Sequence, residues 1–108
     1  MNQSQLDRAF FALSDPSRRD LLQQLAGGPK TVNALAEPYD ISRPAISRHL
    51  RILRQAGLVR VRVEGREHWH VLDVETLEDA NLWFQQFWRT ALRSLKDHVE
   101  GTPFESAS

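Results

Sequence analysis

Helix start and stop signals divide the first 57 residues into short segments, and this punctuation limits what the chain can fold into. Asp15-Pro16 places an N-cap residue before a proline at the first helical position, and the Gly-Gly-Pro run at 27–29 ends the helix that it starts. Ser42 can cap a later helix with Pro44 in its first turn, and Gly57 supplies the stop for that helix. We therefore expect several short helices, joined by tight turns.

Apolar residues recur at helical spacing inside each segment, which predicts four amphipathic helices. Thr31 is expected to cap the third of them, which is short and ends near Pro38. The arginines of the fourth fall largely on the side opposite its apolar stripe. The apolar stripes are Leu6, Phe10 and Leu13; Leu21, Leu22 and Leu25; Val32, Leu35 and Ala36; and Ile46, Leu50 and Leu53. The stripes of the second and fourth helices are expected to face the core.

After Leu58 the apolar period changes from helical to two, which predicts a β-hairpin with its turn at 64–66. Placing all apolar residues on one face requires Val61 opposite Trp69 and Val59 opposite Val71. That register would leave the outer face to Arg60, Arg62, His68 and His70.

A last helix is expected from about residue 74 to about Val99, with an apolar stripe wider than one small core requires. We expect residues 1–100 to form one DNA-binding and dimerisation domain and residues 101–108 to be a flexible tail. The predicted fold is mainly α with a small β-hairpin, in which about five helices and a two-stranded wing make a winged helix-turn-helix.

Charge is unevenly distributed along a chain whose formal net charge is zero. Residues 41–66 hold seven arginines against one glutamate, so this window carries +6. Residues 73–108 hold three cations against seven carboxylates, so they carry −4. A basic surface on a neutral protein is typical of a polyanion partner, and arginine suits bidentate contacts to phosphate and guanine.

Composition excludes several classes of function. With no cysteine, the chain has no disulfide, thiolate metal site or cysteine nucleophile. No paired carboxylates, metal cluster or phosphate loop stands out, so we expect no enzymatic activity and no cofactor. No apolar run approaches the length of a membrane span and the polar start is not a signal peptide, so we expect a cytoplasmic protein without a membrane partner.

The predicted order of elements indicates how the chain would meet double-stranded DNA. The short third helix braces the fourth, whose N-terminal half enters the major groove, while the hairpin lies against phosphates or the minor groove. Small Ser42 and Ser47 do not hold the fourth helix away from base edges. The residues expected to bind DNA are Ser42, Arg43, Pro44, Ser47, Arg48, His49, Arg51, Arg54, Arg60, Arg62 and Arg66.

Three stretches carry a family resemblance: LSDPSRRDLLQQL at 13–25, TVNALAEPYDISRPAISRHLRILRQAGLV at 31–59 and VRVEGREHWHVL at 61–72. In this order and spacing they resemble the bacterial ArsR-type winged helix-turn-helix repressors. The resemblance implies a homodimer, paired through its first and last helices, that binds a palindromic operator. It places base reading on Arg43, Pro44, Ser47, Arg48 and His49, and phosphate contact on Arg51 and the wing.

Metal-responsive members of that family carry ligands that this chain lacks. One family site needs cysteines in the third helix, at the position of residues 32–36, where there are none. Another needs paired Asp/His and His/Glu motifs on the last helix, where only Asp97, His98 and Glu100 occur, in a different spacing. Two imidazoles from His68 and His70 do not complete a zinc site, so we expect no regulatory metal.

Aromatic residues crowd the last helix, and they have two interpretations. They could line a pocket for an unidentified small-molecule effector, or they could form a dimer interface, which the width of the stripe favours. The expected interface residues are Leu6, Phe10, Phe11, Trp83, Phe84, Phe87, Trp88, Leu92 and Leu95.

Three further alternatives concern function. His49 beside Ser47 could suggest a nucleophile and base, but residues two apart on a helix do not face each other. Arg18 and Arg19 could touch the DNA backbone or lie on the solvated side of the second helix. The main function predicted is that of a sequence-specific, DNA-binding transcriptional regulator, a dimeric repressor. The alternative is a winged-helix module for protein–protein contact that does not bind DNA.

Overall fold

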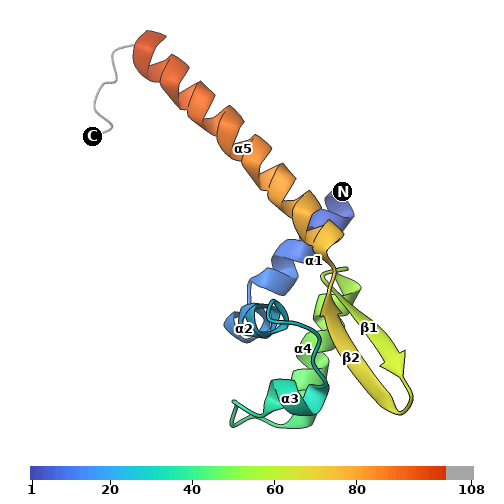
Figure 1. Ribbon diagram of the computed structural model, residues 1–108. Helices are drawn as coiled ribbons and strands as arrows, with labels where there is room; N and C mark the ends of the chain where they lie inside the picture. The colour runs from blue at the N-terminus through green and yellow to red at the C-terminus, as the bar shows by residue number, and fades with distance from the viewer. Residues whose placement is uncertain (102–108) are drawn as a thin grey trace.

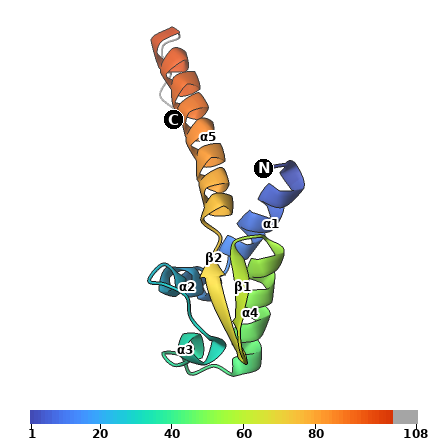
Figure 2. The ribbon, with the colours of Figure 1, turned by 45° about the vertical axis from the view of Figure 1, so that its right-hand side comes forward.

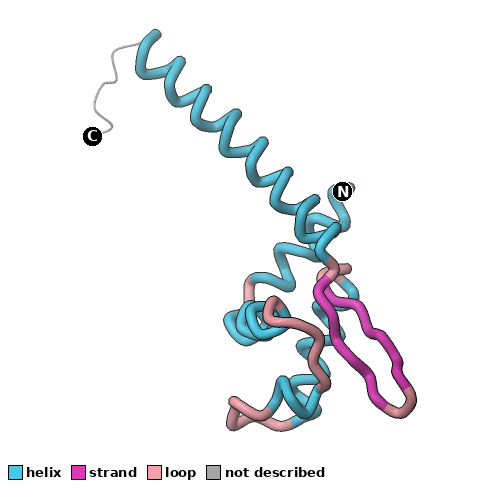
Figure 3. Tube along the Cα trace, in the orientation of Figure 1, coloured by secondary structure: helices cyan, strands magenta, loops and turns pink. Residues whose placement is uncertain are grey.

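The computed structural model describes residues 1–101 as five helices and one antiparallel hairpin (Figures 1 and 3). This element order agrees with the predicted one. Of the predicted tail, only Gly101 is described, as the last residue of a helix, and the rest lies outside the described residues. The elements are α1 (Gln3–Leu13), α2 (Pro16–Leu25), α3 (Val32–Ala36), α4 (Arg43–Gln55), β1 (Val59–Glu64), β2 (Glu67–Leu72) and α5 (Val74–Gly101).

The predicted caps are confirmed. The Asp15 side chain accepts hydrogen bonds from the backbone N–H groups of Ser17 and Arg18, at 2.7 and 3.3 Å. Thr31 and Ser42 each accept one, at 3.3 Å, from the backbone three residues on. Gly57 ends α4 with a φ of 76°, a left-handed conformation that glycine adopts without steric cost.

The core lies where α2, α3 and α4 meet the base of the hairpin. Its largest fully buried side chains are Leu21, Leu35, Ile46, Leu50, Leu53 and Leu58. In α1, Ala9 and Ala12 are buried, whereas Phe10, which shares the predicted stripe with Leu6 and is also a predicted interface residue, is 40% exposed. Small alanine side chains let α1 approach the core closely, so α1 presents them to the core and its phenylalanines to the surface.

The predicted hairpin register is wrong by one residue. Val59 pairs with Leu72 and Val61 with His70, and the loop holds only Gly65 and Arg66. Two-residue loops fit the right-handed twist of paired strands, and Gly65 supplies the positive φ, 62°, that such loops need. Turn geometry therefore set the register, and the apolar residues did not all come to one face.

This register exchanges the predicted faces of β2. His68 and His70 share the face of the β1 valines, and His70 is buried instead of lying on the outer face. Trp69 and Val71 lie on the other face, opposite Arg62 and Arg60, where both are half-buried. The apolar ring of Trp69 thus lies among charged groups of the wing.

Lys30 adds a third backbone segment beside the hairpin. Its N–H donates to the carbonyl of His70 at 3.1 Å, and the His70 N–H donates back at 2.8 Å. This pair of bonds fastens the loop between α2 and α3 to β2. It also holds the His70 ring inside the protein, where its Nδ1 atom has no hydrogen-bond partner.

The last helix projects from the rest of the molecule. α5 starts where β2 ends and extends away from α2–α4, while α1 lies near its first turns (Figures 1 and 2). The Asp73 side chain caps it by accepting from the N–H of Thr76 at 3.1 Å. The molecule measures 64 × 28 × 24 Å, so the length of α5 accounts for its elongated shape.

Acidification should destabilise the fold through His70. Burial lowers the pKa of the His70 imidazole below its usual value, and the charges of Arg54 and His68 lower it further, although the interaction of the ring with the Lys30 backbone raises it. The unfolded chain therefore binds a proton near pH 6.5 that the folded chain does not, and stability falls as pH drops below that value. The slope for one proton is at most about 1.4 kcal/mol per pH unit.

The measurement is chemical denaturation between pH 7.5 and pH 5. We expect the His70→Phe variant, which keeps a ring but cannot titrate, to lose less stability over this range than the parent. Equal losses in both proteins would contradict the assignment to His70.

Candidate nucleic-acid interface

Helix α4 separates a buried side from a basic side. Counting about 100° per residue, its buried positions Ile46, Leu50 and Leu53 fall within an arc of about 60°. Its exposed predicted positions fall within a second arc of about 140°, whose centre lies about 120° around the helix from that of the first. The predicted site residues on this exposed arc are Arg43, Pro44, Ser47, Arg48, Arg51 and Arg54.

The start of α4 is accessible and its backbone is rigid. The Ser42 Oγ accepts from the N–H of Ala45, so this hydroxyl fixes the first turn. Pro44 follows within that turn, where it removes only an N–H that has no intrahelical partner. Arg43 and Ser47 stand exposed one turn apart on the same side. This end can approach another macromolecule closely.

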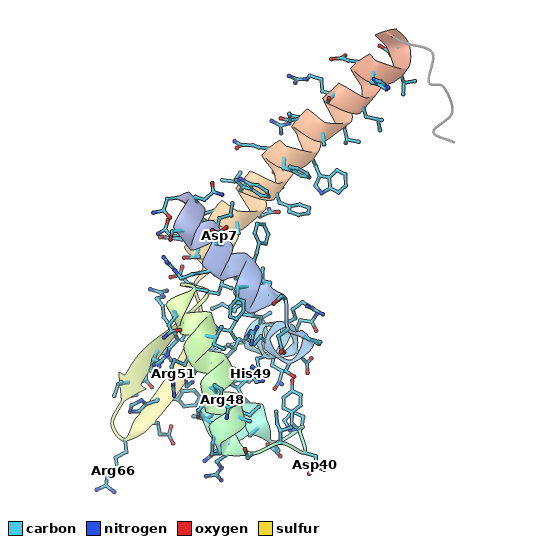
Figure 4. The ribbon with its side chains drawn as sticks, turned by 180° about the vertical axis from the view of Figure 1, so that it is seen from behind. Asp7, Asp40, Arg48, His49, Arg51 and Arg66 are labelled. Atoms are coloured by element: carbon cyan, nitrogen blue, oxygen red, sulfur yellow. The ribbon has the colours of Figure 1, made fainter. Side chains whose placement is uncertain are left out.

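The hairpin extends the basic surface. Its tip and the N-terminal end of α4 lie at the same end of the molecule, away from α5 (Figures 1 and 2). Arg66 projects from the tip into solvent (Figure 4). Arg51 and Arg54 line a groove between α4 and Val61 of β1. Arg48, Arg51 and Arg66 thus provide positive charge on both elements.

Two wing arginines have acidic neighbours. The Arg62 Nε atom lies 3.0 Å from a Glu64 oxygen, and the Arg60 Nε atom lies 3.5 Å from an oxygen of Asp73. Because Asp73 caps α5, Arg60 lies at the junction between wing and helix rather than at the wing tip. The Arg62–Glu64 pair is exposed and can exchange partners at little cost, whereas the Asp73 side chain of the other pair is only 21% exposed. Arg66 is therefore the wing arginine best placed for a phosphate.

His49 lies apart from the other predicted site residues. It is half-buried, on the side of α4 that faces α2 (Figure 4). Its Nδ1 atom lies 3.4 Å from Nη1 of Arg18. Arg18 itself is 6% exposed, so it does not lie on the solvated side of α2, which was one of the two locations considered for it.

Sequence reasoning considered Arg18 but missed its burial and its contact with His49. Its burial could have been inferred from its spacing, because Arg18 lies three residues before Leu21 and seven before Leu25, on the same side of α2 as these buried leucines. Partial burial opposes ionisation of Asp15, but hydrogen bonds from the Arg18 and Ser17 backbone, with the charges of Arg18 and His49, lower its pKa. Asp15 therefore stays ionised beside the buried guanidinium, 3.8 Å away.

The residues predicted for a dimer interface separate into two groups. Leu6 is buried within the protomer and has little surface left for a partner. The aromatic residues of α5 and α1 instead form a continuous exposed stack. The Phe10 and Trp83 rings meet edge to face at 5.5 Å, and Trp83 stacks on Phe87 at 5.6 Å. The predicted interface residues that are exposed, each at 39–61%, are Phe10, Phe11, Trp83, Phe84, Phe87, Trp88, Leu92 and Leu95.

Two searches of residues 1–101 bear on other classes of protein. No three His, Cys, Asp or Glu side chains in this range gather where they could hold a metal ion. Within the same residues, no helix has both the length and the hydropathy of a membrane span.

Comparison with known proteins agrees with this architecture. A helix-turn-helix domain family model matches residues 13–62. The transcriptional repressor SdpR of Bacillus subtilis is 38% identical over 82 residues, which are 76% of this chain and 91% of that protein. A crystal structure of an ArsR family transcriptional regulator is 34% identical, with a TM-score of 0.71, and the match covers 79% of this chain and 97% of that one.

A third similar protein is the homodimeric winged helix-turn-helix DNA-binding domain Mb0332 of Mycobacterium bovis, solved by NMR. It is 27% identical with a TM-score of 0.63, and the match covers 93% of this chain and 86% of that one. The fold and the basic surface thus define a winged helix-turn-helix regulator of transcription. The chain belongs to the ArsR family of DNA-binding transcriptional repressors, as its sequence motifs indicated.

Proposed function

We propose that this protein is a dimeric repressor that reads a palindromic operator with helix α4 and holds phosphates with its wing. The observation that carries the proposal is the division of α4 into a buried leucine-rich side and an exposed arginine-rich side. A protein-docking module, the alternative, would more often present apolar residues on that side. The proposal includes no catalytic step, and it places the protein in the cytoplasm, where bacterial DNA lies.

The Arg48 and Arg66 side chains should have different effects on binding. The probe is a duplex recovered by selection from a random DNA pool. Arg48→Ala should lower affinity for it by about 1–3 kcal/mol and relax the preference at one base pair, because a bidentate arginine discriminates between bases. Arg66→Gln should weaken binding to every duplex and reduce the salt slope by about one, because it removes one phosphate contact.

Arg93→Gln is the matched control, since it removes the same charge from α5, far from the wing. Fluorescence anisotropy at several salt concentrations measures all three variants. Parent protein that binds the selected duplex no better than a scrambled one at moderate salt would contradict sequence-specific binding.

We propose that two copies pair through α5 and α1. The exposed aromatic stack supports this pairing, because burying each large aromatic contributes on the order of 2–3 kcal/mol. Two-fold pairing would present two recognition helices to successive major grooves on one side of the DNA. The homodimeric state of the Mycobacterium bovis domain supports the same arrangement.

Trp88→Ala should weaken the dimer and abolish tight operator binding although it touches no proposed DNA contact. Trp88 is 48% exposed in the protomer, so its loss costs the monomer little. Sedimentation at micromolar concentration measures the association. A parent protein that sediments as a 12.4 kDa monomer and still binds the selected duplex tightly would contradict the dimer.

We propose further that metal ions do not control this repressor. The absence of cysteine and the lack of a suitable cluster among residues 1–101 support this proposal. Adding zinc, cadmium or a chelator should leave operator affinity unchanged within about twofold. A reproducible tenfold loss with any one metal would overturn it, and His68, His70 and His98 would be the first ligands to test.

A further inference from the structure

The Arg18 side chain joins the end of α1 to the start of α2. Its Nε atom donates to the carbonyl of Ala12 at 2.7 Å, and its Nη2 atom donates to the carbonyl of Phe11 at 3.1 Å. The last carbonyl groups of a helix have no intrahelical partner, so this guanidinium caps α1 from the next helix. The Arg18 Cζ atom lies 5.2 Å from the centre of the Phe11 ring, within range of a cation–π contact.

The same guanidinium reaches a third helix. Its Nη1 atom lies 3.4 Å from Nδ1 of His49 on α4, 31 residues along the chain. Because a guanidinium only donates hydrogen bonds, the His49 Nδ1 atom is the acceptor of this contact. His49 lies on the side of α4 that faces α2 (Figure 4), from which the Arg18 side chain reaches it.

The geometry of these bonds makes the contact directional. An arginine side chain presents its donors in one rigid plane, so acceptors on α1 and α4 must keep a fixed mutual arrangement to satisfy them together. The Arg18 side chain is only 7% exposed, and its ion-pair partner Asp15 lies 3.8 Å away. Water cannot readily replace a lost partner at a site buried to this degree.

We propose that Arg18 is a positioning residue for DNA binding, which acts through His49 to fix helix α4 relative to α1. This inference rests on the proposed role of α4 as the recognition helix. Since α1 carries part of the proposed dimer surface, the contact fixes each recognition helix relative to the two-fold axis. Specific binding requires both recognition helices in register with their half-sites, whereas non-specific binding requires only charge. Loss of the contact therefore lowers discrimination between sequences.

The test compares affinities for the selected duplex and a scrambled duplex of the same length. Arg19→Gln is the matched control for Arg18→Gln, because Arg19 also donates to a carbonyl of α1, that of Leu13 at 2.7 Å, but is exposed. On α4, His49→Phe keeps a ring and removes the acceptor, whereas His49→Asn keeps an acceptor near the position of Nδ1. Circular dichroism and sedimentation establish that each variant is folded and has the parent's association state.

The readout is the ratio of the two affinities, which partial unfolding does not change because it lowers both equally. We expect Arg18→Gln and His49→Phe each to reduce this ratio at least tenfold, and Arg19→Gln and His49→Asn to retain it within threefold. In the double variant of Arg18→Gln and His49→Phe, the second change should add less than threefold, because the contact is already lost. If Arg18→Gln does not fold, the two His49 variants decide the matter.

Two results would overturn the positioning role alone: a parent that discriminates while His49→Phe retains its ratio, or losses in the double variant that multiply as independent effects. A parent protein that binds both duplexes equally would overturn the proposed function, and the positioning role with it.

Discussion

The burial of one side of α4 is the interaction on which the rest of the structure depends. Ile46, Leu50 and Leu53 are at most 1% exposed, and they hold α4 against the helices and the base of the hairpin. Each such side chain contributes roughly 1.5–3 kcal/mol when removed from water. The arginines lie outside the buried arc of α4, so burying that arc leaves them on the surface. Packing and the basic surface thus follow from the same spacing of residues.

Most of the fold could be predicted because local rules determine it. Caps at Asp15, Thr31 and Ser42 fix where helices begin, and Gly57 fixes where α4 ends. The register of the hairpin could not be predicted from apolar alternation, because the two-residue loop at Gly65 decided it. His70 was therefore assigned to the wrong face. In α1, the apolar spacing did not show that Ala9 and Ala12, rather than Phe10, pack against the core.

The sequence predicted on which helix or strand each site residue lies better than it predicted the contacts between helices. Helical periodicity places Arg43, Ser47 and Arg48 on one exposed side. It does not show that Arg18 reaches His49, because that contact joins residues 31 positions apart. A charged side chain next to a leucine stripe is usually expected to extend into solvent. Arg18 is instead buried and caps the end of α1 through the carbonyl of Ala12. Contacts of this kind depend on how helices cross, which sequence spacing leaves open.

The spacing between half-sites in DNA selected from a random pool tests the account most directly. Two recognition helices related by a two-fold axis require two inverted half-sites with centres about 34 Å apart, which is about one helical turn of DNA. The account predicts that the selected sequences share such an inverted repeat at that spacing. Selected sequences that share a single half-site, or none, would contradict it.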